Sequence, residues 1–149
     1  MIKIERYEES KDVLYYIKDT DLLHREDGPA VERASGHKEW WIREKLHRED
    51  GPALIDKFGK KEWWVNGKKH REGGPAIIYP NGTKYWYYKG RLHRDDGPAC
   101  SSLDGNLILW YLDDKFFSTK EEWFEALTEE QKVKAIYSEI FMIGSKWIL

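Results

Sequence analysis

Histidine recurs along the chain at a spacing that could serve metal binding or catalysis. His24, His47, His70 and His93 each open the same short motif, "HREDGPA" or a close variant, and successive copies begin 23 residues apart. A histidine beside an arginine and an acid is able to act as a general base or as a metal ligand. A sharp, repeated turn would use the same residue types, so the elements that carry the motif decide between these interpretations.

The motif belongs to a sequence repeat of 23 residues. Each repeat has the motif, a short β-rich run, a glycine turn and a pair of adjacent aromatic residues. Asn-Gly and Asp-Gly between such runs are typical of β-hairpins, and proline after glycine is incompatible with a helix there. The sequence therefore predicts a mainly β protein, a single-layer antiparallel meander of stacked β-hairpins with about two strands per repeat and a short α-helical C-terminal cap.

The whole chain of 149 residues is predicted to be a single domain. Its parts are N-terminal capping strands at residues 1–22, four repeats at 23–115, and a helical C-terminal cap and tail at 116–149.

Two capping-box patterns mark the predicted helices. Ser118 with Glu121 predicts a helix at 119–127, and Thr128 with Gln131 predicts one at 129–141. We expect both helices to fold over the open end of the sheet, because an uncovered edge strand invites aggregation. The apolar residues of the second helix have helical spacing, and they are Val133, Ile136, Tyr137 and Ile140.

Composition excludes several classes of function. The 25 basic and 27 acidic side chains nearly cancel, so no double-stranded nucleic acid partner is expected. The single cysteine, Cys100, rules out an internal disulfide framework. No apolar run approaches the length of a transmembrane helix, and charges in the first six residues predict a cytoplasmic location.

The run "WVNGKKHREGGPAIIYPNG", residues 64–82, resembles the MORN repeat. Gly67, His70, Gly74 and Gly82 match positions of that family's pattern, and the "HREDGPA" string is closer to a variant found in bacterial and bacteriophage proteins. The resemblance implies a sheet of stacked hairpins that serves as a scaffold or binding surface, in some members at membranes. It implies no particular activity.

The histidines are predicted to be structural. Equivalent residues of successive repeats lie about 10 Å apart in such a sheet, too far to share one metal ion. The chain has no P-loop and no nucleophile or metalloprotease motif, so we expect no enzyme activity, no metal and no cofactor. The acids are expected to serve the turn and the arginines to pair with acids, although Gly73 replaces the acid of the third repeat. The structural set is His24, Arg25, Asp27, His47, Arg48, Asp50, His70, Arg71, His93, Arg94 and Asp96.

A binding surface is predicted where the repeats differ. Residues 57–71 carry six cations and one acid, whereas residues 113–130 carry seven acids and two cations. The basic strip and nearby aromatic residues could anchor a protein, or could hold a phosphate and stack a base. The candidate binding residues are Lys57, Phe58, Lys60, Lys61, Lys68, Lys69, Arg71, Tyr79, Tyr85, Trp86, Tyr87, Tyr88 and Trp147.

Three hypotheses for function follow. The first is a non-catalytic module that binds another protein, such as a bacterial defence protein if the source is a phage. The second is capture of a small anionic ligand such as a nucleotide signal, and the third, from the resemblance, is attachment to anionic lipid. An open edge near residues 1–7 would also allow a homodimer.

Overall fold

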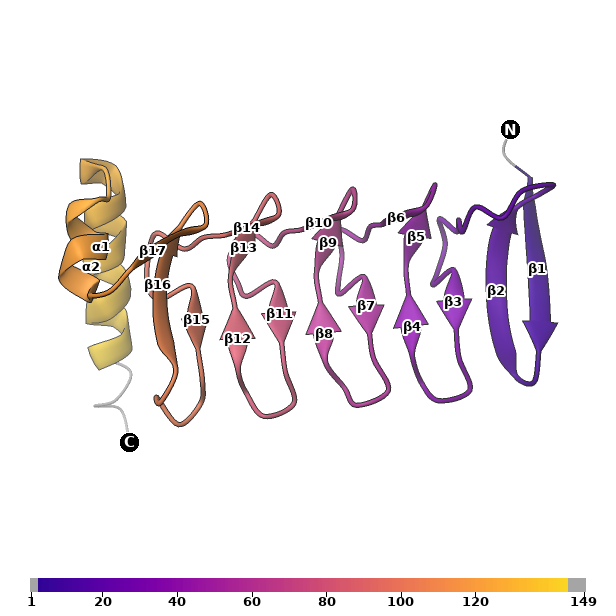
Figure 1. Ribbon diagram of the computed structural model, residues 1–149, viewed down its shortest axis with the longest axis horizontal. Helices are drawn as coiled ribbons and strands as arrows, with labels where there is room; N and C mark the ends of the chain where they lie inside the picture. The colour runs from indigo at the N-terminus through magenta and orange to yellow at the C-terminus, as the bar shows by residue number, and fades with distance from the viewer. Residues whose placement is uncertain (1–2, 145–149) are drawn as a thin grey trace.

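The protein forms a row of β-hairpins closed at one end by two helices (Figure 1), in a computed structural model that describes residues 3–144. Eleven strands make one antiparallel sheet in which the strands follow chain order. This confirms the predicted fold class, a hairpin meander with a helical C-terminal cap.

The sheet runs from the N-terminal end to the helices. Its strands are β1 (Ile4–Glu9), β2 (Asp12–Ile17), β3 (Val31–Glu32), β4 (Lys38–Glu39), β7 (Leu54–Ile55), β8 (Lys61–Glu62), β11 (Ile77–Ile78), β12 (Lys84–Tyr85), β15 (Cys100–Ser101), β16 (Ile108–Leu112) and β17 (Lys115–Phe117).

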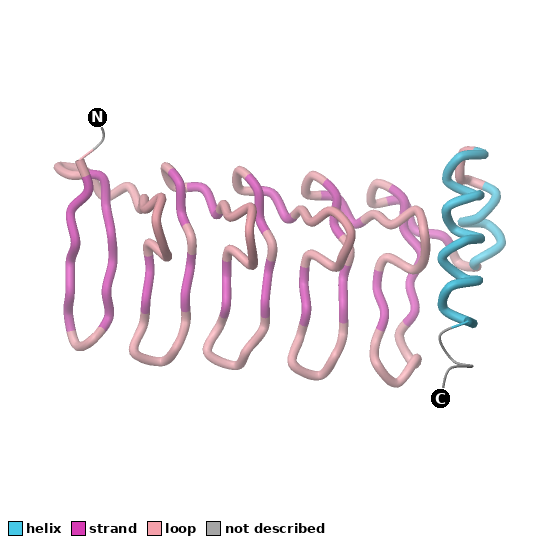
Figure 2. Tube along the Cα trace, turned by 180° about the vertical axis from the view of Figure 1, so that it is seen from behind, coloured by secondary structure: helices cyan, strands magenta, loops and turns pink. Residues whose placement is uncertain are grey.

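A second, smaller hairpin belongs to each of the first three repeats. These hairpins are β5 (Trp41–Ile42) with β6 (Lys45–Leu46), β9 (Trp64–Val65) with β10 (Lys68–Lys69), and β13 (Tyr87–Tyr88) with β14 (Arg91–Leu92). They line one side of the row (Figure 2). A repeat thus has four short strands where the sequence predicted about two, because the turn after the aromatic pair also closes a hairpin.

The register keeps equivalent residues in line across the sheet. Glu62 lies opposite both Leu54 and Ile77, so the three side chains share one face. Lys61 lies opposite Ile55 and Ile78 on the other face. The second ring of two of the aromatic pairs is held by the strand residue two positions earlier: Trp41 Nε1 donates to Glu39 at 2.6 Å, and Trp64 Nε1 donates to Glu62 at 2.9 Å.

The centre of each repeat is the alanine that ends its motif. Ala30, Ala53, Ala76 and Ala99 are fully buried. The backbone around them is closely bonded, since Ala53 receives a hydrogen bond from Trp40 N and donates one to Glu62 O, both at 2.8 Å. A larger side chain at these positions would separate neighbouring hairpins.

The helices α1 (Lys120–Glu125) and α2 (Glu129–Gly144) cover the last hairpin. Their core contains Phe117, Trp123, Leu127 and Ala135. The ring of Trp123 lies 4.7 Å from that of Trp110, and its Nε1 donates to the carbonyl of Arg94 at 3.1 Å. The cap is therefore anchored to the fourth repeat.

One of the two predicted capping boxes is displaced by one residue. Thr119, not Ser118, is the N-cap of α1, because its side chain accepts a hydrogen bond from Glu122 N at 3.1 Å. Glu122, in place of Glu121, reaches back to the backbone of Ser118 at 3.1 Å. At α2 the predicted reciprocal bonds between Thr128 and Gln131 are present, at 3.0 and 3.3 Å.

The four apolar residues of α2 with predicted helical spacing do not face the sheet. Among the helix residues 129–140, Ala135 is buried, whereas these four have exposed fractions between 47% and 68%. They are Val133, Ile136, Tyr137 and Ile140. Ala135 therefore contributes to the cap core, and the face formed by the other four side chains is open to solvent.

The far end of the sheet is the exposed strand β1, which pairs with β2 over six residues. The homodimer through this edge stays a prediction. In the part of the chain from residue 3 to 144, no helix has the length and apolar character needed to cross a membrane.

Candidate functional site

The arginine of each motif is stacked on an aromatic ring that lies eight or ten residues earlier in the chain. The distance from the guanidinium carbon to the ring centre is 3.9 to 4.2 Å in all four copies. The pairs are Arg25 on Tyr15, Arg48 on Trp40, Arg71 on Trp63 and Arg94 on Trp86. Such a stack combines a cation–π attraction with flat packing.

A glycine lies on the other side of each guanidinium. A Cβ atom added to Gly28, Gly51, Gly74 or Gly97 would come within 2.8 to 3.2 Å of the guanidinium carbon. Glycine lets the guanidinium keep this position, whereas a Cβ would force it to shift. The guanidinium is therefore held flat between a ring and a backbone.

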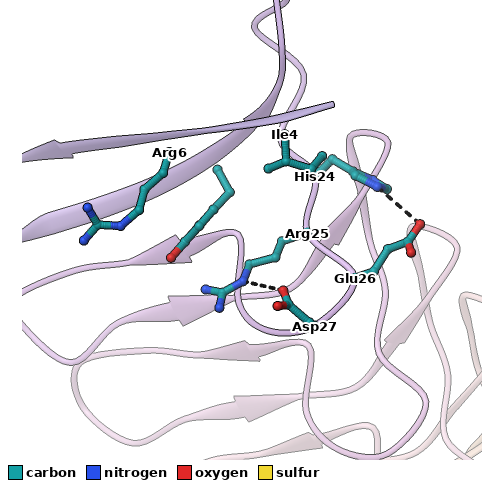
Figure 3. A pocket seen from close by; sticks show the side chains of 7 residues that line it. Ile4, Arg6, His24, Arg25, Glu26 and Asp27 are labelled. Carbon is teal, nitrogen blue, oxygen red and sulfur yellow. Dashed lines mark hydrogen bonds and ion pairs between the residues drawn. The ribbon is translucent and has the colours of Figure 1, made fainter. Parts of the chain in front are cut away.

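Polar contacts fix the edges of the guanidinium. In every copy an Nη1 atom donates to the proline carbonyl four residues later, at 3.2 to 3.4 Å. In three copies Nε also donates to the motif aspartate, at 2.6 to 2.8 Å. Figure 3 shows the first copy, in which Arg25 contacts Asp27. The hydrogen bonds from Arg25 and Arg48 hold the pKa values of Asp27 and Asp50 below their usual range.

The third copy departs from this arrangement. Gly73 replaces the aspartate and has a φ of +70°, with nothing within 4 Å of the place where its Cβ would be. Over residues 3–144, Arg71 makes its one side-chain hydrogen bond to the carbonyl of Pro75. Burial lowers the pKa of the Arg71 guanidinium, with no acid to oppose it.

The histidines connect the start of each repeat to the turn at its end. Their Nδ1 atoms accept the backbone N–H of a residue 19 or 20 positions later, at 3.0 to 3.2 Å. The donors are Arg43, Asn66, Lys89 and Asp113, which all have φ near +50°. Non-glycine residues rarely adopt this conformation, so the histidine stabilises a strained turn.

No group of three or more potential metal ligands occurs in the described part of the chain. The Nε2 atoms of His24, His47 and His70 instead lie 3.5 to 3.8 Å from the glutamate two positions on.

The basic strip is divided between two places. Lys57, Lys60 and Lys61 lie in the loop between β7 and β8 or at its end, whereas Lys68 and Lys69 form β10 at the other end of the repeat (Figure 1). Two of these lysines are engaged locally. Lys60 Nζ pairs with Glu62 at 2.8 Å, and Lys69 Nζ lies 5.2 Å from the ring centres of both Trp64 and Tyr87.

The aromatic candidates serve several roles. Tyr79 and Tyr85 pack edge to face at 5.9 Å, and a hydrogen bond with Cys100 together with burial raises the pKa of Tyr85 to about 12. Tyr88 lies between His70 and His93, at 4.9 and 5.9 Å.

The remaining aromatic candidates differ in exposure. Trp86 carries the Arg94 guanidinium, and Tyr87 is half-buried. Phe58 is 73% exposed at a loop tip. Trp147 lies outside the described residues.

Two surfaces stand out in the structure, and only the second contains residues that the sequence predicted for binding. One is the exposed apolar face of α2, defined by Val133, Ile136, Tyr137 and Ile140. The other is a hollow of about 650 Å³ beside Arg71 that Gly73, Trp86 and Tyr88 help to line and that Gln131 and Lys134 of α2 border. This lining brings together the predicted binding residues Arg71, Trp86, Tyr87 and Tyr88. The replacement of the motif acid by Gly73 is the feature of the sequence that marks this repeat.

Comparison with known proteins returns no match to any protein-family model, any curated protein or any solved structure.

Proposed function

We propose that the protein is a non-catalytic module that binds another protein through the exposed apolar face of α2. The observation that carries the proposal is this face, where four large apolar side chains are each about half exposed or more. Contiguous exposed apolar surface of this kind is typical of protein interaction sites. The i, i+3, i+4, i+7 spacing suits an amphipathic helix of the partner, packed along α2.

The rest of the molecule supports α2 as a rigid platform. Trp123 anchors the cap, Lys134 pairs with Asp95 at 2.7 Å, and Lys120 of α1 pairs with Glu139. A surface held in place before binding loses little conformational entropy when the partner docks. The histidine, arginine and aspartate of the motif have structural contacts in this fold, which is consistent with a module that performs no chemistry.

The test begins with a protein captured by the full chain from its natural host. The captured protein is identified, purified and titrated by calorimetry against wild type, Ile136→Glu and Ile140→Glu. Because a charge in the apolar contact is left unpaired on binding, we expect each variant to weaken the complex by about tenfold or more. Both side chains are exposed, so the melting temperature should change little.

Phe58→Glu is the matched control, since Phe58 is equally apolar and exposed but lies in the β7–β8 loop. A complex that tolerates the α2 variants and is lost with Phe58→Glu would refute the α2 surface. Analytical ultracentrifugation of the protein alone tests whether the α2 face instead joins two copies of the chain. A dimer that dissociates in Ile136→Glu would assign the face to self-association and contradict the proposal.

The ligand-capture hypothesis gains less support. Its lysines lie at two ends of the repeat, and Lys60 and Lys69 are occupied by Glu62 and by aromatic rings. That the partner is a defence protein stays a prediction, as do the MORN resemblance and attachment to lipid.

A further inference from the structure

The guanidinium of Arg71 is built like its three counterparts but lacks the carboxylate that completes them. In those copies Nε donates to an aspartate at 2.6 to 2.8 Å, while Gly73 leaves that place open in the third repeat. We propose that Arg71 is a receptor for a carboxylate, supplied by an aspartate or glutamate side chain of a bound protein. The aspartates of the other repeats show how such a group sits.

The site is organised before any ligand arrives. Trp63 lies 3.9 Å from the guanidinium carbon on one side, Gly74 approaches it on the other, and Pro75 accepts a hydrogen bond from Nη1 at 3.2 Å. These three contacts restrain the group, and the residue that Nε bonds in the other copies is replaced here by Gly73, with nothing within 4 Å of its Cβ position. Little side-chain entropy remains to be lost when a carboxylate binds.

The charges around the hollow single out Arg71. The other cations that line it are each paired with an acid: Arg91 with Asp113 at 3.2 Å, Arg94 with Asp96 at 2.6 Å and Lys134 with Asp95 at 2.7 Å. Glu72, the remaining acid, lies 3.8 Å from His70 Nε2, and its side chain is largely exposed, as are those of Glu26 and Glu49. Within the described residues, Arg71 is thus the cation of the hollow with no acidic partner.

Partial burial makes the missing partner costly. The guanidinium has lost part of its hydration, which is why its pKa is lowered, and a charge-assisted hydrogen bond would compensate for that loss. Nε and Nη2 form a fork that matches the two oxygens of a carboxylate. The inference rests on the proposed function only for the source of the carboxylate, and residues of α2 border the same hollow.

Arginine Nε–Hε resonances in ¹⁵N NMR spectra of the full chain test the inference directly. The probe is a blocked tri-glutamate peptide, with a blocked tri-lysine peptide and sodium chloride at equal ionic strength as controls. We expect the Hε resonance of Arg71 to shift with tri-glutamate alone, while those of Arg25, Arg48 and Arg94 stay in place because their aspartates occupy them. An unmoved Arg71 resonance, or equal shifts of all four, would overturn the proposal.

Two reciprocal variants separate the site from general electrostatics. Gly73→Asp should reduce the Arg71 response by about tenfold or more, once the turn changes from its φ of +70°, where an L residue is strained, to the negative φ that Asp27, Asp50 and Asp96 adopt. Asp50→Gly should open Arg48 and make its resonance respond, a gain that misfolding cannot imitate. If Arg48 remains silent in Asp50→Gly, the missing aspartate is not what creates the site.

Two further experiments identify the anion that Arg71 binds and distinguish the arginine site from the α2 surface. Inorganic phosphate that shifts Arg71 when tri-glutamate does not would contradict a carboxylate site. Ile136→Glu should weaken binding through α2 by about tenfold or more and leave the Arg71 response intact. Failure of the α2 surface would therefore not be mistaken for failure of the arginine site.

Discussion

The residues of the motif have distinct physical roles in the repeat. The histidine accepts the N–H of a strained turn, the arginine stacks on a ring, the glycine leaves room for it, and the alanine is buried at the centre. Lysine in place of the arginine would lose the flat stack and the second donor edge. The motif is therefore a unit of packing, and a change at one position is felt by the others.

Gly51→Ala tests that unit. The new Cβ would lie 2.9 Å from the Arg48 guanidinium carbon, so the arginine must leave its ring and its partners. We expect a loss of about 1–3 kcal/mol in the free energy of unfolding, measured with urea. Gly74→Ala, with a separation of 3.2 Å, should cost less.

A double-mutant cycle identifies the cause. If the clash with the guanidinium is responsible, Gly51→Ala should cost much less in an Arg48→Ala background. An equal loss in both backgrounds would point to the glycine backbone instead.

Acid should weaken the fold through the motif aspartates. Arg48 holds the pKa of Asp50 below its usual value of 3.8, so between the two values the unfolded chain binds more protons. The free energy of unfolding therefore rises with pH in that interval. The stabilising contribution of the Asp50–Arg48 pair is fully present above the interval and is lost as the pH falls through the pKa of the folded state. Asp50→Asn removes this contribution, and its urea unfolding should depend less steeply on pH below about 4 than that of wild type.

Asp104→Asn is the comparison variant for Asp50→Asn. The pKa of Asp104 is also lowered, but its hydrogen-bond partners in the loop are neutral, so this variant removes no ion pair with an arginine. An acid slope that is unchanged in Asp50→Asn would show that the arginine pair contributes nothing to folding.

At the scale of the elements, hairpins were more predictable than surfaces. The 23-residue period and the turn residues predicted the strand order, since each repeat reports the same local preference. The face of α2 that is exposed was not predictable. Its apolar spacing resembles that of a core-facing stripe, and which face is buried depends on the shape of the cap; the residues are Val133, Ile136, Tyr137 and Ile140. The basic strip was misleading as a single surface, because the second hairpin carries Lys68 and Lys69 away from Lys60.

The start of α1 gives a prediction at this scale. Thr119→Ala should lower the free energy of unfolding by about 1 kcal/mol, because the bond that its hydroxyl accepts from Glu122 N is lost. Ser118→Ala should cost less, since the backbone N–H of Ser118 still donates to Glu122. Thermal unfolding of the two variants decides whether Thr119 or Ser118 is the N-cap. A larger loss of stability for Ser118→Ala would favour Ser118, the cap predicted from the sequence.

The whole molecule is a one-dimensional array in which each repeat contacts its neighbours. The two ends differ, since one is the charged strand β1 and the other is the helical cap. Stability is then expected to depend on repeats and on the interfaces between them, so the number of repeats can change without loss of the fold.

Removal of residues 46–68 should give a shorter folded protein. Strand β4 would then take the place of β8 beside β11. Both β4 and β8 have the sequence Lys-Glu, so the pairing with β11 should be kept. Two strands fewer should shorten the particle by about 10 Å, which small-angle X-ray scattering can measure. Deletion of residues 46–60 removes part of a repeat and should unfold the protein; if both deletions behave alike, the repeats are not independent units.

The strands lie across the long axis of the row, so the hydrogen bonds between them point along it (Figure 2). A force that pulls the two ends apart would therefore load these bonds in series, a few at a time, and not as one cooperative block. Each repeat released would add about 80 Å of extended chain. Under tension the protein would lengthen in steps, one repeat after another, at low force.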